Sequence, residues 1–414
     1  MVRRAGPHTG IQVIKIDASQ LRLGMYVCEL DRPWIEAPFL FQGFMLSDPD
    51  DLMTLRSLCH HVYIDCLKTT INLDKLKRSA PEMAAPVYPV VSDIRTELPQ
   101  AAQCYGETFS AVRNMLRALE DGRDAPVSAM PALVHGCVES IIRNPSAMLW
   151  LTRIKHKDQY TAEHCMNVGV LAMALGRKVG LGRKHIELLG LCGMLHDVGK
   201  MRLDQTILNK PGRLTAEEFE HVKLHVTYGH EELSRDPELP SEVLKVALSH
   251  HERLDGKGYP RRLPAARLDF YTRATAVVDT YDAITSRRCY SDAQSSATAL
   301  RILYENRGTQ FDERLVVQFI DCIGIYPPGV LVELNTGEVG VVLSVDSSNR
   351  LSPRVGLVRD AQKRPMQQRV VDLAEQQGVE VSQRMRIAQV LVDGSYGVDL
   401  ESFTRQNIRL GGQA

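Results

Sequence analysis

The sequence predicts a mainly α protein, in which a helical domain lies between a small N-terminal α+β domain and a C-terminal β-rich region. Three observations predict this fold class. Apolar residues recur at helical spacing through residues 101–326, β-branched runs occur on both sides of that stretch, and prolines are frequent in residues 71–100. The chain has 414 residues, enough for about two to four domains.

The N-terminal α+β domain is expected to cover residues 1–70. Apolar and polar residues alternate in residues 11–16, and residues 61–65 are β-branched and aromatic, so both are predicted strands. Between them, residues 49–58 have the apolar spacing of a short helix. The domain is a candidate regulatory module, although nothing in it identifies a signal.

Residues 71–100 are predicted to form a linker. They contain Pro81, Pro86, Pro89 and Pro99 among charged residues. Because proline lacks a backbone N–H and clashes with the preceding turn, repeated prolines are expected to prevent a continuous helix.

Residues 101–326 are predicted to be helical almost throughout. One helix start is well marked: Thr215 and Glu218 have the spacing of a capping box, and Leu214 is placed for a hydrophobic staple. Residues 186–195 and 241–249 are expected to form two further helices.

After Pro328 the pattern changes, and residues 327–414 are predicted to form a β-rich region. Residues 330–334 and 339–345 are rich in β-branched residues, and a polar segment containing Gly337 separates them. This pattern predicts a β-hairpin with a short turn.

Composition excludes some function classes. Lys and Arg number 50, as do Asp and Glu, so no chain-wide basic excess indicates a long nucleic-acid partner. Residues 141–290 are moderately basic, with 23 Lys and Arg against 18 Asp and Glu. No apolar run approaches the roughly 18 residues of a membrane span, and no signal peptide is recognisable. With nine cysteines and no C-x-x-C pair, a cytoplasmic protein is expected.

Histidines gather in one part of the chain, since nine of the 13 lie between His156 and His251. His196-Asp197 ends the apolar helix 186–195, and Lys200 is expected one helical turn beyond His196. Both side chains of the His-Asp pair can turn into one cavity, and the two carboxylate oxygens can bridge two cations.

Further candidate ligands follow along the chain. His250-His251 precedes a glycine-rich loop, and two consecutive histidines are rarely both core residues. Asp279 interrupts the apolar face of a predicted helix, so it needs a partner or a metal ion. His164 lies on another amphipathic helix. His221 and His225 lie one turn apart, and one of them is expected to face the cavity. Imidazole and carboxylate ligands favour Fe, Mn, Zn, Ni or Co over Ca or Mg.

These residues resemble a known family. His164, His196-Asp197 and Asp279 match the HD phosphohydrolase superfamily in order and spacing, and Lys200, His225, His250-His251 and the Gly258-Tyr259-Pro260 loop resemble its HD-GYP subfamily. The resemblance covers about residues 140–325. The N-terminal region resembles the small domain often found ahead of HD-GYP domains.

The resemblance implies metal-dependent hydrolysis of cyclic di-GMP, a bacterial second messenger, to linear pGpG, GMP or both. One metal ion would be held by His164, His196, Asp197 and Asp279, and the other by His225, His250 and His251, with Asp197 bridging. Some family members hold a third metal ion through a glutamate; Tyr160 occupies that position here, which favours two divalent ions such as Fe, Mn, Ni or Co.

The resemblance also implies roles in substrate binding and partner binding. Lys200 would bind the scissile phosphate or help protonate the leaving 3′ oxygen, Arg288 resembles the family's phosphate-binding arginine, and Tyr259 is expected to contact the substrate. A second copy of the chain or a signalling protein is expected to bind through the Gly258-Tyr259-Pro260 loop. Two alternatives remain open: a catalytically weak cyclic di-GMP receptor or protein-interaction module, and a hydrolase of another phosphoester.

Overall fold

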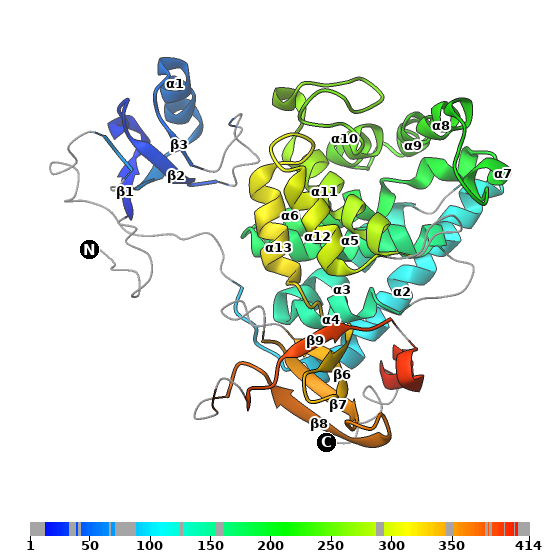
Figure 1. Cartoon of the computed structure of the whole chain (residues 1–414). Helices are drawn as coiled ribbons and strands as arrows, with labels where there is room; N and C mark the ends of the chain where they lie inside the picture. Colours follow the sequence, from blue (N-terminus) through cyan, green and yellow to red (C-terminus); the bar gives the residue numbers. More distant parts are fainter. Residues whose placement is uncertain are drawn as a thin grey trace. The chain divides into compact units, whose positions relative to one another are not determined.

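A computed structural model describes the fold of most of the chain. The described residues are 13–32, 39, 43–65, 68–70, 88–124, 127–154, 160–286, 294–344, 352–376, 380, 383–392, 394–400 and 402–404. They form two compact units, residues 1–87 and 88–414 (Figure 1). The predicted fold class is confirmed: a helical region, an N-terminal α+β unit and a C-terminal antiparallel sheet.

The first unit is a four-stranded antiparallel sheet with one helix. The strands run in the spatial order β1-β4-β2-β3, and the elements are β1 (Val13–Asp17), β2 (Tyr26–Leu30), β3 (Phe44–Met45), α1 (Pro49–Leu58) and β4 (His61–Asp65). Asp48 caps α1 by accepting a hydrogen bond from the Asp50 amide. Leu55 of α1 packs with Val27, Val62 and Ile64 in one buried apolar cluster. The predicted helix of residues 49–58 and strand of residues 61–65 are confirmed, as is the predicted strand of residues 11–16 from Val13 onward; residues 11 and 12 lie outside the described residues.

The second unit contains the helical region. Its α-helices are α2 (Ile94–Glu120), α3 (Met130–Arg143), α4 (Pro145–Leu151), α5 (Tyr160–Lys178), α6 (Arg183–Leu195), α7 (Gln205–Leu208), α8 (Ala216–Lys223), α9 (His225–Leu233), α10 (Ser241–Ser249), α11 (Phe270–Thr285), α12 (Ser296–Glu305) and α13 (Glu313–Ile323). The capping box is confirmed: Thr215 and Glu218 exchange both hydrogen bonds at the start of α8. None of the helices within the described ranges combines the length and apolar character that a bilayer crossing requires.

Helix α2 corrects one expectation from the sequence. It begins at Ile94 and contains Pro99, so the prediction that prolines keep all of residues 71–100 out of a helix is wrong for residues 94–100. Pro99 removes one backbone hydrogen bond from the helix. That loss is offset because α2 buries an apolar face, which includes Leu98, Ala101 and Tyr105.

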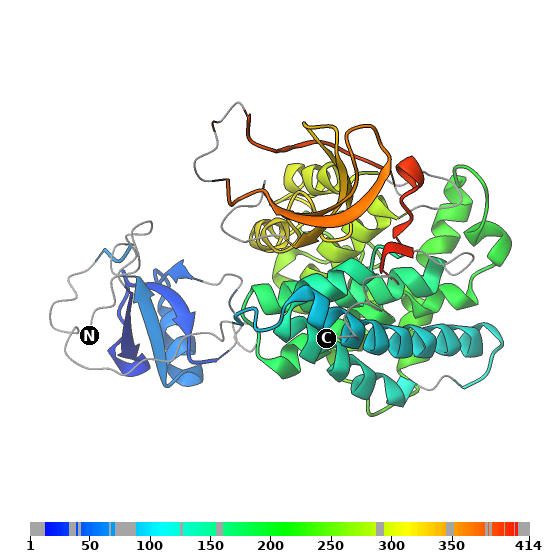
Figure 2. The ribbon, with the colours of Figure 1, turned by 90° about the horizontal axis from the view of Figure 1, so that it is seen from below.

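The C-terminal region forms a curved five-stranded antiparallel sheet (Figure 2). Its spatial order is β8-β7-β6-β5-β9, and its strands are β5 (Leu331–Leu334), β6 (Val339–Ser344), β7 (Arg354–Arg359), β8 (Pro365–Asp372) and β9 (Ile387–Val390). The predicted hairpin is confirmed as β5 and β6, with Gly337 at a positive φ in the turn. Trp150 of α4 stacks on Phe403 and donates a hydrogen bond to Thr404, which attaches this region to the helices.

Candidate metal centre

The close packing of α5 against α6 brings the first candidate ligands together. A Cβ atom at Gly193 would lie only 2.8 Å from the Cα of Gly169, so the two helices can approach this closely only because neither residue has a side chain. The approach places His164, on α5, beside His196, which directly follows α6, and the two rings lie 5.2 Å apart in an edge-to-face arrangement.

A second close contact brings in His225. The chain leaves the α-helical path at Asp197 and continues as a 3₁₀ helix from Val198 to Arg202. A Cβ atom at Gly199 would lie 2.0 Å from the backbone oxygen of His225. Only glycine therefore allows this 3₁₀ helix to pack directly on the start of α9.

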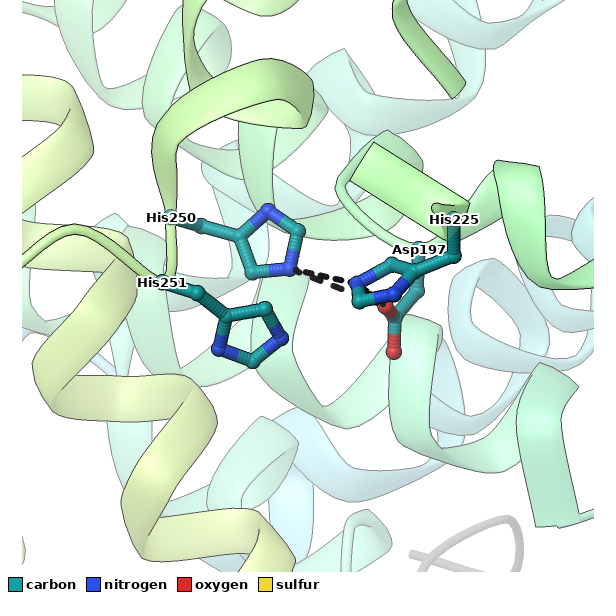
Figure 3. Close-up of side chains that lie close together, drawn as sticks. All are labelled: Asp197, His225, His250 and His251. Atoms are coloured by element: carbon teal, nitrogen blue, oxygen red, sulfur yellow. Dashed lines mark hydrogen bonds and ion pairs between the residues drawn. The ribbon is translucent and has the colours of Figure 1, made fainter. Parts of the chain in front are cut away.

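The structure places all seven candidate ligands in two adjacent groups. His164, His196 and Asp279 form the first, which we call the Asp279 group, and Asp197, His225, His250 and His251 form the second, the His250 group (Figure 3). In each group, one ligand atom per residue lies within 4.8 Å of the others. Of the two histidines left open by the sequence, His225 is the fully buried one.

Asp197 connects the two groups. Its Oδ2 lies 3.4 Å from Nε2 of His164 and 3.2 Å from Nε2 of His196. Its Oδ1 lies 3.4 Å from Nε2 of His225 and 3.7 Å from Nε2 of His250. Each carboxylate oxygen thus faces a different group, as a carboxylate shared by two cations requires.

The histidine rings are oriented by acceptors behind them. Nδ1 of His164 lies 2.8 Å from Oδ2 of Asp282, and Nδ1 of His196, His225 and His250 lies 2.7, 2.6 and 3.1 Å from a backbone carbonyl oxygen. Because a carboxylate or carbonyl oxygen only accepts, Nδ1 carries the hydrogen and donates it. The Nε2 atoms therefore point into the site, and in the neutral form of each ring Nε2 is the nitrogen that can bind a metal ion.

These residues fit a metal centre by their unsatisfied atoms. Nε2 of His164, Nε2 of His196 and Oδ1 of Asp197 are buried without a hydrogen-bond partner. Buried polar atoms are rarely left unpaired, because the loss of hydration is then uncompensated. Two of these atoms, on His164 and His196, face the Asp279 group, and Oδ1 of Asp197 faces the His250 group. Because all three residues can bind a transition metal, the unpaired atoms indicate a cation in each group.

The two groups have opposite electrostatics. Burial favours neutral imidazole, but around His164 and His196 the carboxylates of Asp197 and Asp279 outweigh it and raise the pKa of His164 to about 10 and that of His196 to about 9. In the His250 group, burial is the largest effect on the pKa values, and neighbouring histidines act in the same direction. Together they lower the pKa of His225 to about 4 and that of His251 to about 3, and they also lower the pKa of His250.

Both aspartates are held in the charged form. Burial alone would raise the pKa of Asp197, yet Lys200 and His196 lower it well below its usual value. Likewise His164 and His196 outweigh the burial of Asp279 and lower its pKa. The centre therefore offers two anionic ligands at neutral pH.

A cavity of about 470 Å³ opens beside the two groups. Lys200 and Tyr259 line it together with His225, His251 and Asp279. Lys200 forms an ion pair with Asp197 from the 3₁₀ helix. The expectation that Lys200 lies one α-helical turn beyond His196 is therefore wrong, because the chain leaves the α-helical path at Asp197. Arg288 lies outside the described residues.

Sequence reasoning missed the residues behind His164. Asp282 accepts from His164 and also from the side-chain amide of Asn167, whose oxygen accepts from the hydroxyl of Tyr105 on α2. Spacing offered a signal, since Asn167 follows His164 by three residues and Asp282 follows Asp279 by three, so each pair shares a helix face. The contribution of Tyr105 depends on how α2 packs and had no local signal.

Comparison with known proteins agrees with this geometry. Three family models match: a domain of unknown function (DUF3391) over residues 13–130, the HD domain over 142–315, and a KOW domain associated with the HD domain over 331–390. The chain is 38% identical to a cyclic di-GMP phosphodiesterase of Pseudomonas aeruginosa over 371 residues, 87% of this chain and 88% of that protein. The chain belongs to the HD domain family.

Two further relatives match smaller shares of the chain. A cyclic di-GMP phosphodiesterase response regulator of Xanthomonas campestris is 31% identical over 73% of this chain and 81% of its own length. The 3′3′-cGAMP-specific phosphodiesterase 2 of Vibrio cholerae is 33% identical over 39% of this chain and 31% of its own length. The resemblance to the HD family, recognised from the sequence motifs, is confirmed.

The DUF3391 match includes α2, which packs in the same unit as the HD domain.

Proposed function

We propose that this chain is a metal-dependent phosphodiesterase that hydrolyses cyclic di-GMP to linear pGpG, GMP or both. The observation that best supports the proposal is Asp197, whose two oxygens face two separate groups of buried metal-binding side chains. Two adjacent cations sharing one carboxylate are a common device of phosphoester hydrolysis. The substrate is inferred from the Pseudomonas aeruginosa relative, which this chain matches over 88% of that protein.

Two divalent transition-metal ions are the proposed cofactors, with Fe, Mn, Ni or Co as candidates. His164, His196 and Asp279 would hold one, His225, His250 and His251 the other, and Asp197 both. When bound, such ions acidify a water molecule and neutralise charge on the phosphoryl oxygens. The unpaired Nε2 atoms of His164 and His196 support this assignment.

Protein side chains around the cavity have their own proposed tasks. Lys200 is partly buried and already paired with the Asp197 carboxylate, so its ammonium group is held where a substrate phosphate would lie. Tyr259 stacks on His251, with ring centroids 4.7 Å apart, and forms one wall of the cavity. A cavity of about 470 Å³ falls within the range of about 300–1,000 Å³ of small-molecule sites.

The loop that contains Tyr259 is held in place by the side chain of Glu252. The buried carboxylate of Glu252 accepts hydrogen bonds from the backbone amides of Arg261 and Leu263, at 2.7 and 3.0 Å. Charge-assisted bonds of this kind fix a loop strongly.

We also propose that the N-terminal unit regulates the activity, and that the Gly258-Tyr259-Pro260 loop contributes to binding of a second copy or of a signalling protein.

Hydrolysis by metal-loaded protein tests the proposal. The chain would be purified without oxygen, loaded separately with Fe, Mn, Ni or Co, analysed for bound metal, and mixed with cyclic di-GMP or 3′3′-cGAMP. We expect about two metal ions per chain and release of pGpG or GMP from cyclic di-GMP. Both dinucleotides are needed because a Vibrio cholerae relative is named for 3′3′-cGAMP.

Matched histidine variants serve as controls. His225→Ala removes a proposed ligand at the start of α9, whereas His230→Ala removes a histidine of the same helix that belongs to neither group. Only the first should abolish hydrolysis. Tight binding of cyclic di-GMP without turnover by every metal-loaded form would overturn the proposal in favour of a receptor.

A further inference from the structure

Helix α8 presents an aromatic side chain at the cavity beside the metal centre. Phe219 lines that cavity with Val222 and His225, and the three follow one another at intervals of three residues. Although burial of a phenyl ring is favourable, 46% of Phe219 is exposed. Among exposed apolar side chains Phe219 is notable because it lines this cavity, where aromatic side chains commonly contact a ligand.

Phe219 extends the row of rings that begins at the histidines. Tyr259 stacks on His251 and lies 6.4 Å from the ring of His225. Tyr259 also meets Phe219 edge to face, with centroids 6.4 Å apart and planes at 79°. Phe219 therefore contacts the ring that stacks on the proposed ligand His251, and all three side chains line the same cavity.

A cation adjoins this aromatic surface. Nζ of Lys223 lies 4.8 Å from the ring centroid of Phe219 and 5.5 Å from that of Tyr259. Glu220 holds it by a hydrogen bond of 2.6 Å. A cation on an aromatic face suits a flat, electron-rich ligand that also carries negative charge, which describes a nucleotide.

The helix that holds Phe219 is firmly placed. Glu218 closes the capping box with Thr215 and also accepts two hydrogen bonds from Lys210, both of 2.7 Å. Three further apolar side chains, Ile207, Leu208 and Leu214, line the same cavity. Apolar side chains of this kind can accept the face of a base.

We propose that Phe219 forms a base subsite, in which a purine of the substrate stacks on its ring while the phosphate lies at the metal centre. Lys223, which adjoins the Phe219 ring outside the cavity lining, adds positive charge beside that subsite. The inference rests on the proposed function for the identity of the substrate as a purine nucleotide. The subsite accounts for binding of the base and takes no part in the chemical step.

The experiment compares ligands with and without a base. Binding of GMP and of ribose 5-phosphate to metal-loaded protein would be measured by calorimetry, for the wild type and for Phe219→Ala, Phe219→Trp and Tyr304→Ala. Tyr304, also 46% exposed, is an exposed aromatic residue that does not line the cavity, and so it is a matched control. Phe219→Ala should weaken GMP binding about tenfold and leave ribose 5-phosphate unchanged. Phe219→Trp should retain GMP binding.

Steady-state kinetics provide the second measurement. For cyclic di-GMP, Phe219→Ala should raise KM about tenfold with kcat unchanged, because stacking contributes equally before and during reaction. Equal loss of GMP and ribose 5-phosphate binding, or GMP binding equal to that of the wild type, would overturn the subsite. A wild type that prefers GMP over ribose 5-phosphate yet does not hydrolyse cyclic di-GMP would instead contradict the proposed function alone.

Discussion

The Asp279 group and the His250 group use the same residue types in opposite electrostatic environments. In the Asp279 group, burial lowers the pKa of His164 and of His196, but the neighbouring carboxylates outweigh this effect, so both pKa values are raised. In the His250 group, three histidines lie around the single carboxylate of Asp197, which does not outweigh burial. The pKa of each of the three histidines is therefore lowered. Burial alone therefore does not decide the charge of a histidine; the nearest charges do.

The difference has a consequence for metal binding. A metal ion binds the neutral form of imidazole. At neutral pH the His250 group already has neutral histidines, whereas the Asp279 group must first release protons. The negative charge of further carboxylates favours a cation in the Asp279 group and offsets the cost of releasing those protons. Besides Asp197, these carboxylates are Asp279, which contacts the histidines, and Asp282, which lies behind His164. We therefore expect the two groups to differ in how pH controls their occupancy.

Asp197→Asn should have the largest effect, because it removes the charge common to both groups while keeping the size of the side chain. We expect loss of bound metal from both groups and a fall in turnover greater than about 100-fold, more than is typical of residues behind the ligands. Metal analysis and hydrolysis of cyclic di-GMP measure it. Retention of two metal ions by this variant would show that the groups are independent.

Asp282→Asn should have a smaller and one-sided effect. Its carboxylate accepts from Nδ1 of His164, which belongs to the Asp279 group. We expect metal affinity of the Asp279 group to fall about 10- to 100-fold, with the His250 group unchanged. Competition against a chelator measures the two affinities, and Ser286→Ala, which removes a 3.2 Å hydrogen bond to Asp282 but leaves its carboxylate in place, is the milder control.

Much of this centre could be predicted from the sequence. The ligands were found because motif spacing and family resemblance do not depend on tertiary detail. Helix α10 was found because its apolar residues, including Val243, Val246 and Ala247, recur at helical spacing. Other features depend on packing. The helix through Pro99 is stabilised by a buried face, the placement of Lys200 follows a turn at Asp197, and Phe219 is identified only by its position beside Tyr259.

Proton release on metal binding should distinguish the groups more finely. At pH 7.5 the raised pKa values of His164 and His196 keep both protonated in metal-free protein, so binding there should release about two protons per ion. Binding to the His250 group should release almost none, because its histidines are already neutral. Calorimetry in buffers of different ionisation enthalpy measures the number. Equal release from the two groups would contradict the contrast.

The smallest expected effect is on the stability of metal-free protein. In the unfolded chain histidine binds a proton near pH 6.5, but folded His225 and His251 resist protonation down to about pH 4 and 3. Stability should therefore fall as pH decreases from about 6.5 toward 4. His164 and His196 do not oppose this, since their contribution is fully present below pH 6.5, and the aspartates lose theirs only below their usual pKa.

Urea unfolding of chelated protein at pH 7 and pH 5 measures this effect. His251→Gln should reduce the difference between the two midpoints, because one group that resists protonation is gone. A midpoint that rises toward pH 5 in the wild type would mean that the His250 group is protonated in the folded protein.

The central claim is that the two groups form one centre joined by Asp197. Electron paramagnetic resonance of the Mn²⁺-loaded protein tests it directly, because two ions that share a carboxylate are spin-coupled. We predict a coupled spectrum for the wild type and its loss in Asp197→Asn. A wild-type spectrum of isolated Mn²⁺ ions at full loading would contradict the claim.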